Sequence, residues 1–187
     1  NNDELAEKLQ FMQKATGAVP SPFDCWLILR STKTLDLRYQ KAADNANVLA
    51  WWLAKQKKLD RVIYPGLKSH PQYDIAVKQQ RTPNGDVIFG NMISIDIGSI
   101  EARDSFIKKL EIFTLAESLG GVESLVCAPY NMTHAAVPEK TKLEMGITET
   151  LVRLSIGIED VDDLKTDLKN ALRSEERRVG KECRSRW

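Results

Sequence analysis

Hydrophobic positions at the start of the chain recur at the spacing of a helix. Leu5, Leu9 and Met12 follow one another at intervals of three or four residues, which predicts an amphipathic helix. Asn2 stands before this stretch as a candidate N-cap, and Gly17 follows it as a residue that commonly ends a helix. The pattern therefore predicts a first helix between these two residues.

A second helical pattern begins after the prolines of AVPSPF (18–23). Ser21 followed by Pro22 is typical of an N-cap and the first helical position. From there apolar residues recur at helical spacing to about Lys55, with a break expected at residues 32–34. A helical stretch of this length predicts a spine that joins two bodies rather than one compact element.

Shorter periods follow the spine and alternate between strand and helix. Strands are expected near residues 61–64 and 92–97, within 112–128 together with a glycine turn, and at 151–157; helices are expected near 73–77, 100–110, 143–146 and 161–172. The clearest strand has Ile93, Ile95 and Ile97 on one face. The spacing suits a small, mostly antiparallel sheet flanked by helices. The expected fold class is therefore α/β to α+β, with a long N-terminal spine helix.

Composition excludes several classes of protein without identifying a function. The 187 residues are 42% hydrophobic and 28% charged, which is ordinary for a globular protein with a buried core. A net charge of +1 gives no field that would favour nucleic acid or an anionic membrane as partner. No apolar run approaches the roughly 20 residues of a membrane span, and the first residues do not read as a signal peptide.

The cysteines indicate a reducing compartment. Cys25, Cys127 and Cys183 are odd in number and far apart in the chain. Such a set fits neither a disulfide framework nor the ligand spacing of a metal site. We therefore expect a cytoplasmic protein without a bound metal.

The end of the chain differs from the rest. Residues 173–187 are polar and basic and have no helical or strand period; without them 21 basic and 23 acidic residues remain, a net charge of −2. In one reading frame, the DNA of a common sequencing-library adapter encodes Arg173 through Cys183 in this order. We interpret residues 173–187 as a disordered artefact of gene assembly. The alternative is a natural basic tail that docks a partner.

Arg153 is the residue that physical reasoning singles out. In LVRLSIG (151–157), a period of two places Arg153 and Ser155 on one face of a strand, opposite three aliphatic residues. A guanidinium among aliphatic side chains is costly to bury without an anion, and its fork matches a carboxylate. Two interpretations stay open. Arg153 binds the carboxylate of a ligand, or it is exposed to solvent or paired with an internal carboxylate, the candidates being Glu117, Glu123 and Asp160.

A bend that contains two glycines is the second candidate site. In ESLGGVES (117–124), paired glycines allow either a tight structural turn or a close approach of the backbone to a ligand. It is no phosphate loop, because no Lys-Ser or Lys-Thr follows. MTH (132–134) holds one of only two histidines, and a single histidine is more often a satisfied loop residue than a metal ligand or base. A non-catalytic module that binds an amino acid remains an alternative for the whole chain.

Five blocks of the sequence resemble consecutive blocks of one enzyme family. They are GAVPSPFDCWLILR (17–30), VIYPGLKSHPQ (62–72), FTLAESLGGVESL (113–125), MTHAAVP (132–138) and GITETLVRLSIGIEDVDDL (146–164). In this order they are similar to the cystathionine γ-lyase and γ-synthase family of pyridoxal-phosphate-dependent transsulfuration enzymes. The resemblance covers nearly all of residues 3–172, and the blocks together are highly specific.

The resemblance implies a fold, an activity and an assembly. The fold is the C-terminal small domain of a type I pyridoxal-phosphate enzyme that works as a cytosolic homotetramer. Residues 1–40 would end the cofactor-binding large domain and start the spine, and residues 41–172 would form the substrate-side domain. The implied activity is γ-elimination of L-cystathionine to cysteine, 2-oxobutanoate and ammonia. A cystathionine γ-synthase or a methionine γ-lyase-like enzyme is the alternative within the family.

The resemblance also implies roles for four residues. Arg153 would hold the α-carboxylate of the substrate, and Ser118 would lie at the same end of the substrate. Glu117 would lie near the distal amino-acid portion, and Thr133 near the same pocket. The sequence ESLGG at 117–121 favours γ-chemistry, because the position of Glu117 is typically apolar in the β-lyase branch of the family.

The residues that bind pyridoxal 5'-phosphate are expected outside this chain. In the family, the covalent lysine, the stacking aromatic, the aspartate at the ring nitrogen and the phosphate-binding groups all precede the part that this chain resembles. No lysine here stands in that motif, so we expect no catalytic residue in the chain and no activity from the chain alone. One departure, Ser31 in place of a usual glycine, concerns the packing of the spine rather than the chemistry.

Overall fold

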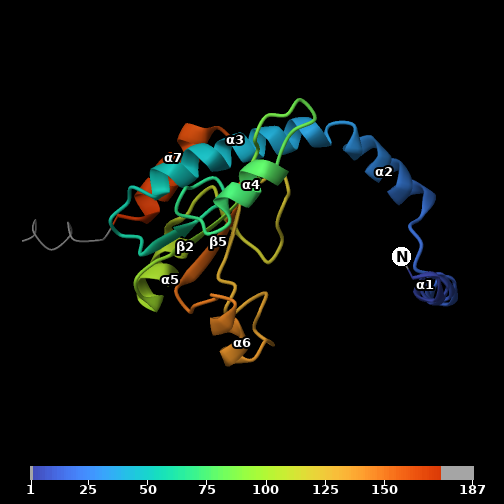
Figure 1. The fold of residues 1–187 in the computed structure, drawn as a ribbon. Coiled ribbons are helices and arrows are strands. Elements are labelled where there is room, and N and C mark those ends of the chain that lie inside the picture. Colours follow the sequence, from blue (N-terminus) through green and yellow to red (C-terminus); the bar gives the residue numbers. More distant parts are fainter. Residues whose placement is uncertain (1, 174–187) are drawn as a thin grey trace, which may run out of the picture. The chain divides into compact units, whose positions relative to one another are not determined.

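The computed structural model describes residues 2–173 (Figure 1). Contacts between residues divide the chain after Leu37 into two compact units. Most of the stretch that we interpret as an artefact, residues 174–187, lies outside the described residues. Within the described part, no helix combines the length and the apolar character that a membrane crossing requires.

The first unit contains two capped helices, α1 (Asp3–Thr16) and α2 (Pro22–Thr32). The side-chain oxygen of Asn2 accepts a hydrogen bond from the amide of Leu5 at 3.0 Å. Gly17 ends α1 with a φ of 66°, a conformation that glycine adopts without steric cost. Ser21 begins α2 in a reciprocal capping box with Asp24. The predicted helix starts and the first helix end are therefore confirmed.

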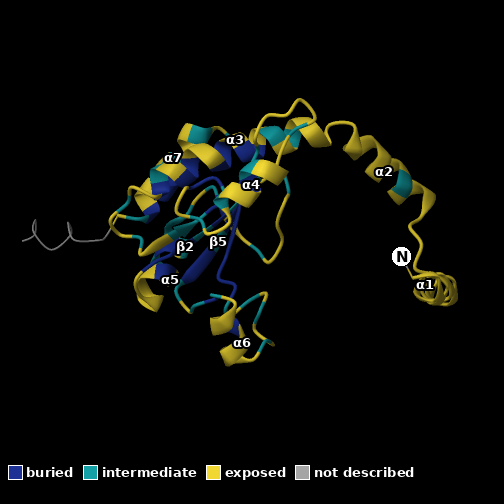
Figure 2. Ribbon diagram, viewed as in Figure 1, coloured by how far each residue is buried: buried dark blue, intermediate teal, exposed yellow. Residues whose placement is uncertain are grey.

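The predicted spine is divided into two helices. α2 ends at Thr32, and α3 (Leu35–Leu53) begins three residues later, so the break falls where the pattern predicted it. No described residue of α1 or α2 is buried, as the yellow ribbons of Figure 2 show. Both helices expose large apolar side chains, among them Phe11 and Trp26. The role of these helices as a spine between two bodies stays a prediction.

The second unit is a five-stranded sheet with helices. Its strands are β1 (Arg61–Ile63), β2 (Met92–Asp96), β3 (Thr114–Leu115), β4 (Leu125–Cys127) and β5 (Leu151–Ser155), and its further helices are α4 (Tyr73–Gln79), α5 (Ile100–Lys109), α6 (Glu139–Glu144) and α7 (Val161–Ala171). The order across the sheet is β1-β2-β5-β4-β3. Neighbouring strands are antiparallel except for the parallel pair β3 and β4. The mixed, mostly antiparallel sheet is therefore confirmed.

One face of the sheet is packed against helices. Ile93 and Ile95 of β2 lie opposite Leu154 and Val152 of β5, and all four side chains are fully buried. They share one hydrophobic core with residues of α3, α5 and α7, including Leu49, Phe106 and Leu164. Figure 1 shows α3 and α7 along the same side of the central strands. The alternation of the strand sequences thus fixes which face receives the helices.

The other face of the sheet carries polar side chains. Ser94 of β2, Arg153 of β5 and Cys127 of β4 lie in one cross-strand row, because Arg153 is in register with both neighbours. Asp96 and Ser155 lie on the same face, each two residues along its strand from this row. This row is the part of the fold that positions the candidate site.

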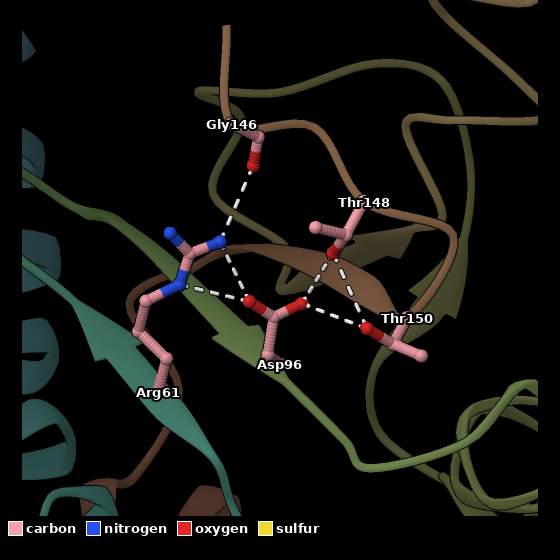
Figure 3. Close-up of polar contacts among 5 residues, drawn as sticks. All are labelled: Arg61, Asp96, Gly146, Thr148 and Thr150. Atoms are coloured by element: carbon pink, nitrogen blue, oxygen red, sulfur yellow. Dashed lines mark hydrogen bonds and ion pairs between the residues drawn. The ribbon is translucent and has the colours of Figure 1, made fainter. Parts of the chain in front are cut away.

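A buried carboxylate fixes the segment that enters β5 (Figure 3). Asp96 is 6% exposed, and one of its oxygens pairs with the guanidinium of Arg61 at 2.6 Å. The other oxygen accepts hydrogen bonds from the hydroxyls of Thr148 at 2.6 Å and Thr150 at 3.0 Å. Arg61 also donates to the carbonyl of Gly146. The network joins β1 and β2 to residues 146–150, directly before the strand that bears Arg153.

Two further buried polar side chains attach loops to helices. Asp167 of α7 accepts hydrogen bonds from three consecutive backbone amides, those of Glu111, Ile112 and Phe113. Asn45 of α3 donates its side-chain amide to carbonyls beyond the end of β5, at residues 157 and 159. These contacts fix the chain before β3, the strand that leads into residues 117–124, and after β5, the strand that bears Arg153.

Candidate functional site

Arg153 lies at the centre of the polar face with no carboxylate partner. Its Nη2 donates to the backbone carbonyl of Glu117 at 3.3 Å, and the residue is half-buried. Among residues 2–173, no ion pair includes Arg153, although four other ion pairs are present. Asp160, one of the candidate internal partners, instead caps the N-terminus of α7. The guanidinium is therefore oriented by a neutral carbonyl and keeps other N–H groups for an anion.

The bend at 117–121 presents its side chains to solvent. Glu117 and Ser118 are both exposed, directly after β3. Gly120 has a φ of 76°, a left-handed conformation that favours glycine, and its amide donates to the Ser155 hydroxyl at 2.8 Å. Arg153 and Ser155 thus hold the two ends of the segment 117–120 against one strand. The bend is a structural turn, and its first two side chains remain available to a ligand.

The chain just after the bend is fixed by the segment that follows β5. A side chain at Gly157 would collide with the backbone of residues 122 and 123, so only glycine permits this close approach. The amide of Gly157 donates to the hydroxyl of Ser124, and that hydroxyl in turn donates to the carboxylate of Glu159. The Ile158 amide donates to the carbonyl at residue 122. Residues 122–124 are therefore held more tightly than residues 117–119.

Cys127 places a neutral sulfur beside the guanidinium. The residue is 1% exposed and lies directly opposite Arg153 in the register of β4 and β5. Burial raises the pKa of the Cys127 thiol, and the positive charge of Arg153 and its hydrogen bond to the sulfur oppose that rise only in part. The thiol consequently stays protonated near neutral pH and does not neutralise Arg153.

Thr133 lies on a separate loop. Its exposed hydroxyl shares a hydrogen bond of 2.8 Å with Nδ1 of His134. The loop is held from α6 by Lys142, whose buried amine donates to the carbonyls of Tyr130 and Ala135 and lies 4.2 Å from the Tyr130 ring centroid. No hydrogen bond or ion pair in the described chain joins Thr133 to Glu117, Ser118 or Arg153. A shared pocket for all four residues stays a prediction.

Sequence reasoning missed two neighbours of Arg153. A period of two placed Ser155 on the same face as Arg153, but no pattern in the sequence announced its bond to the Gly120 amide. Cys127 was considered only as a possible disulfide or metal residue. Its position opposite Arg153 depends on which strands pair and in what register. The only signal in the sequence for these neighbours was that an arginine and a polar residue stand two positions apart on one strand.

A covalently bound aldehyde cofactor requires a lysine amine in a protected pocket. Lys142 is the one buried lysine among residues 2–173, and its amine is engaged by two carbonyl oxygens and an aromatic ring. We therefore assign no residue of the described chain to the covalent attachment of such a group. The donor set around Arg153 fits a carboxylate instead.

Comparison with known proteins gives one family. Residues 1–173 match the family described as Cys/Met metabolism PLP-dependent enzyme. The chain is 50% identical over 172 residues to a cystathionine gamma-lyase of Dictyostelium discoideum, covering 92% of this chain and 43% of that protein. It is 46% identical over 173 residues to a cystathionine beta-lyase of Coxiella burnetii, again covering 92% of this chain and 43% of the relative. The chain therefore spans less than half the length of these relatives.

Solved structures share this fold. The cystathionine gamma-lyase from yeast superposes with a TM-score of 0.82 at 50% identity, over 92% of this chain and 43% of that one. A cystathionine gamma synthase from Xanthomonas oryzae pv. oryzae, in complex with cystathionine, also gives a TM-score of 0.82, at 41% identity over 91% of this chain and 43% of its own. The sheet and its helices match lyases and synthases alike.

Proposed function

The chain belongs to the Cys/Met metabolism PLP-dependent enzyme family, and on that premise we propose that it is the C-terminal part of an enzyme that cleaves L-cystathionine by γ-elimination. The products of the whole enzyme are cysteine, 2-oxobutanoate and ammonia. Its cofactor is pyridoxal 5'-phosphate, the cofactor of the family. We further propose that the whole protein is a cytoplasmic homotetramer and that residues outside this chain hold the cofactor.

The unpaired guanidinium of Arg153 carries this proposal. It is half-buried, has hydrogen bonds to the backbone carbonyl of Glu117 and to the neutral thiol of Cys127, and is in no ion pair among the described residues. A planar fork in these surroundings favours a carboxylate, which it binds through two parallel hydrogen bonds. Every amino-acid substrate of this chemistry carries an α-carboxylate, so a single contact orients all of them.

The chain's share of the reaction is substrate orientation. Pyridoxal phosphate, when bound, withdraws electrons from the reacting carbons of the substrate. Arg153 fixes the α-carboxylate, and the exposed Ser118 directly follows in sequence the residue whose carbonyl orients Arg153. In this proposal Glu117 lies near the distal amino-acid portion, and Thr133 lies near the same pocket. Such anchoring raises the fraction of bound substrate in a reactive geometry.

A cystathionine γ-synthase is the second candidate. The Xanthomonas enzyme, whose structure contains cystathionine, matches this chain over the same range and with the same TM-score as the yeast γ-lyase. The sequence of the bend at 117–121 supports γ-chemistry but does not separate cleavage of cystathionine from its formation. Whether the whole enzyme cleaves cystathionine or forms it is therefore the property to measure.

Product analysis tests the proposed function. We expect the full-length protein, loaded with pyridoxal phosphate, to convert L-cystathionine to cysteine and 2-oxobutanoate. The 187-residue chain alone should form neither product and should retain no cofactor absorbance after gel filtration, since the described residues offer no free, protected amine. Homocysteine and pyruvate as the main products would contradict γ-elimination. Turnover by the chain alone would contradict the proposal that residues outside this chain hold the cofactor.

Replacing Glu117 should change the choice between γ- and β-elimination. Glu117→Leu keeps the backbone carbonyl that orients Arg153 but removes an exposed carboxylate from the proposed distal end of the substrate. We expect the ratio of cysteine to homocysteine formed from cystathionine to fall about 10- to 100-fold, the effect of losing one charge-assisted hydrogen bond. Chromatography of the products measures the ratio. Glu123→Leu is the matched control, and an unchanged ratio in Glu117→Leu would disprove the assigned role.

A further inference from the structure

Ser155 has a hydroxyl whose position the proposed reaction does not explain. The residue is 2% exposed and lies on the same face of β5 as Arg153, two positions further along. Its Oγ accepts a hydrogen bond of 2.8 Å from the amide of Gly120. A buried strand residue therefore reaches the surface bend that carries Glu117 and Ser118.

The two polar residues of β5 act on the same segment. Arg153 donates to the carbonyl of Glu117 at one end, and Ser155 accepts from the amide of Gly120 at the other. The following residues are fixed independently, because Ile158 and Gly157 hold residues 122 and 124. Within the described structure, the hydrogen bond that Ser155 accepts is thus the one that ties residue 120 to the sheet.

The carbonyl of Glu117 is also the backbone acceptor that orients the guanidinium, beside the Cys127 thiol on the neighbouring strand. A guanidinium fork recognises a carboxylate only when its plane has the right direction, and a shift of about 1 Å is enough to weaken a catalytic geometry severely. The position of this carbonyl is fixed only while the backbone of the segment 117–120 is itself held in one position. The direction of Arg153 therefore depends on the hydrogen bond that Ser155 makes.

We propose that Ser155 is a positioning residue for the substrate carboxylate, acting through the bend at 117–120 on the guanidinium of Arg153. This inference rests on the proposed function, because it assigns to Arg153 the carboxylate of an amino acid. It extends that function by a residue that touches neither substrate nor cofactor. Ser155 sets how well the site distinguishes an amino acid from an amine without a carboxylate.

If Ser155 served only the stability of the fold, Ser155→Ala would lower stability without specifically weakening recognition of the carboxylate. Gly120 is exposed, so water can replace the lost acceptor when Ser155 becomes alanine, and the fold should lose little stability. The geometry at Arg153 nevertheless changes, because water does not hold the bend in one place. Recognition of the carboxylate should therefore weaken more than stability does.

The test uses two competitive inhibitors of the full-length enzyme that differ only in the carboxylate. L-Homoserine carries it, and 3-aminopropan-1-ol is the same molecule without it. In Ser155→Ala we expect the inhibition constant of homoserine and the KM of cystathionine to rise about 3- to 10-fold, as one hydrogen bond is lost. The inhibition constant of aminopropanol and kcat should change less than about twofold. Ser155→Cys, of similar size but with a weaker acceptor, should lie between Ser155→Ala and the unchanged enzyme.

Each outcome decides a separate question. Equal weakening of both inhibitors in Ser155→Ala and Ser155→Cys would overturn the positioning role, and so would an unchanged constant for homoserine. Arg153→Ala serves as the reference, because it should abolish the preference for homoserine. If that variant keeps the preference, the proposed function of Arg153 fails; if it loses the preference while both Ser155 variants keep it, only the role of Ser155 fails. Ser105→Ala, which removes a serine hydroxyl from α5, controls for general effects of the substitution.

Discussion

Arg153→Ala lowers kcat/KM for cystathionine roughly 100- to 1,000-fold, because removing one partner of a desolvated, hydrogen-bonded charge pair costs about 3–4 kcal/mol. The structure supports this expectation with a half-buried guanidinium that has no carboxylate partner among residues 2–173. The loss should appear chiefly as a higher KM, since the contact already exists in the bound ground state. Steady-state kinetics of the full-length enzyme measure both constants.

The controls separate the charge of Arg153 from its shape. Arg153→Lys keeps the charge but not the planar fork, so it should recover only part of the lost kcat/KM. Arg81→Ala is the matched control, because Arg81 also donates to a backbone carbonyl but lies in an exposed loop. Cofactor absorbance should stay unchanged in all three variants. Loss of cofactor from Arg153→Ala, with normal binding of substrate by the remaining holoenzyme, would contradict the assigned role.

Local sequence signals predicted the helices well because capping is a short-range interaction. Asn2, Gly17 and Ser21 each act within about one turn of their own position, and each performs the predicted function. The break of the long helical pattern was also visible, at residues 32–34. Strand faces were predictable for the same reason, since alternation alone placed Ile93 and Ile95 in the core and Arg153 outside it.

The candidate site was only partly predictable because it depends on strand pairing. Arg153 could be named from its strand, but its neighbours come from β2 and β4, which are distant in sequence. No local sequence pattern predicts that Cys127 lies opposite Arg153. The absence of an internal ion pair was equally hidden, because the sequence offered three carboxylates that could have reached it. Register and loop geometry determine which side chains lie near Arg153, and composition does not predict them; ligand binding by Arg153 stays a prediction.

One strand organises the whole candidate site. Along β5 and the residues after it, alternate positions contact successive parts of the segment 117–124: Arg153 contacts residue 117, Ser155 contacts residue 120, and Gly157 contacts residue 124. The start of the same strand is fixed by the Asp96 network shown in Figure 3. A substrate contact on Arg153 is thus built on a central strand in which the other four residues are buried, where small displacements are costly.

Asp167→Ala should have the largest effect on local stability. The carboxylate of Asp167 accepts hydrogen bonds from the amides of residues 111, 112 and 113, and the residue is only 6% exposed. Its removal leaves these amides without their acceptor beside α7, at a cost of about 2–4 kcal/mol. Residues 111–113 lead directly into β3 and the bend that begins at Glu117. The damage should therefore spread toward the candidate site.

Hydrogen–deuterium exchange of the full-length protein measures this effect without assuming two-state unfolding. In Asp167→Ala, peptides that cover residues 111–117 should exchange roughly 30- to 1,000-fold faster, the factor that corresponds to about 2–4 kcal/mol. Asp167→Asn retains one acceptor oxygen and should show a smaller increase. Asp163→Ala, on the exposed first turn of α7, should change exchange in this segment by less than about fivefold, because it loses only an interaction with the helix dipole. Faster exchange confined to α7 would show that Asp167 stabilises its own helix rather than the chain that leads to the bend.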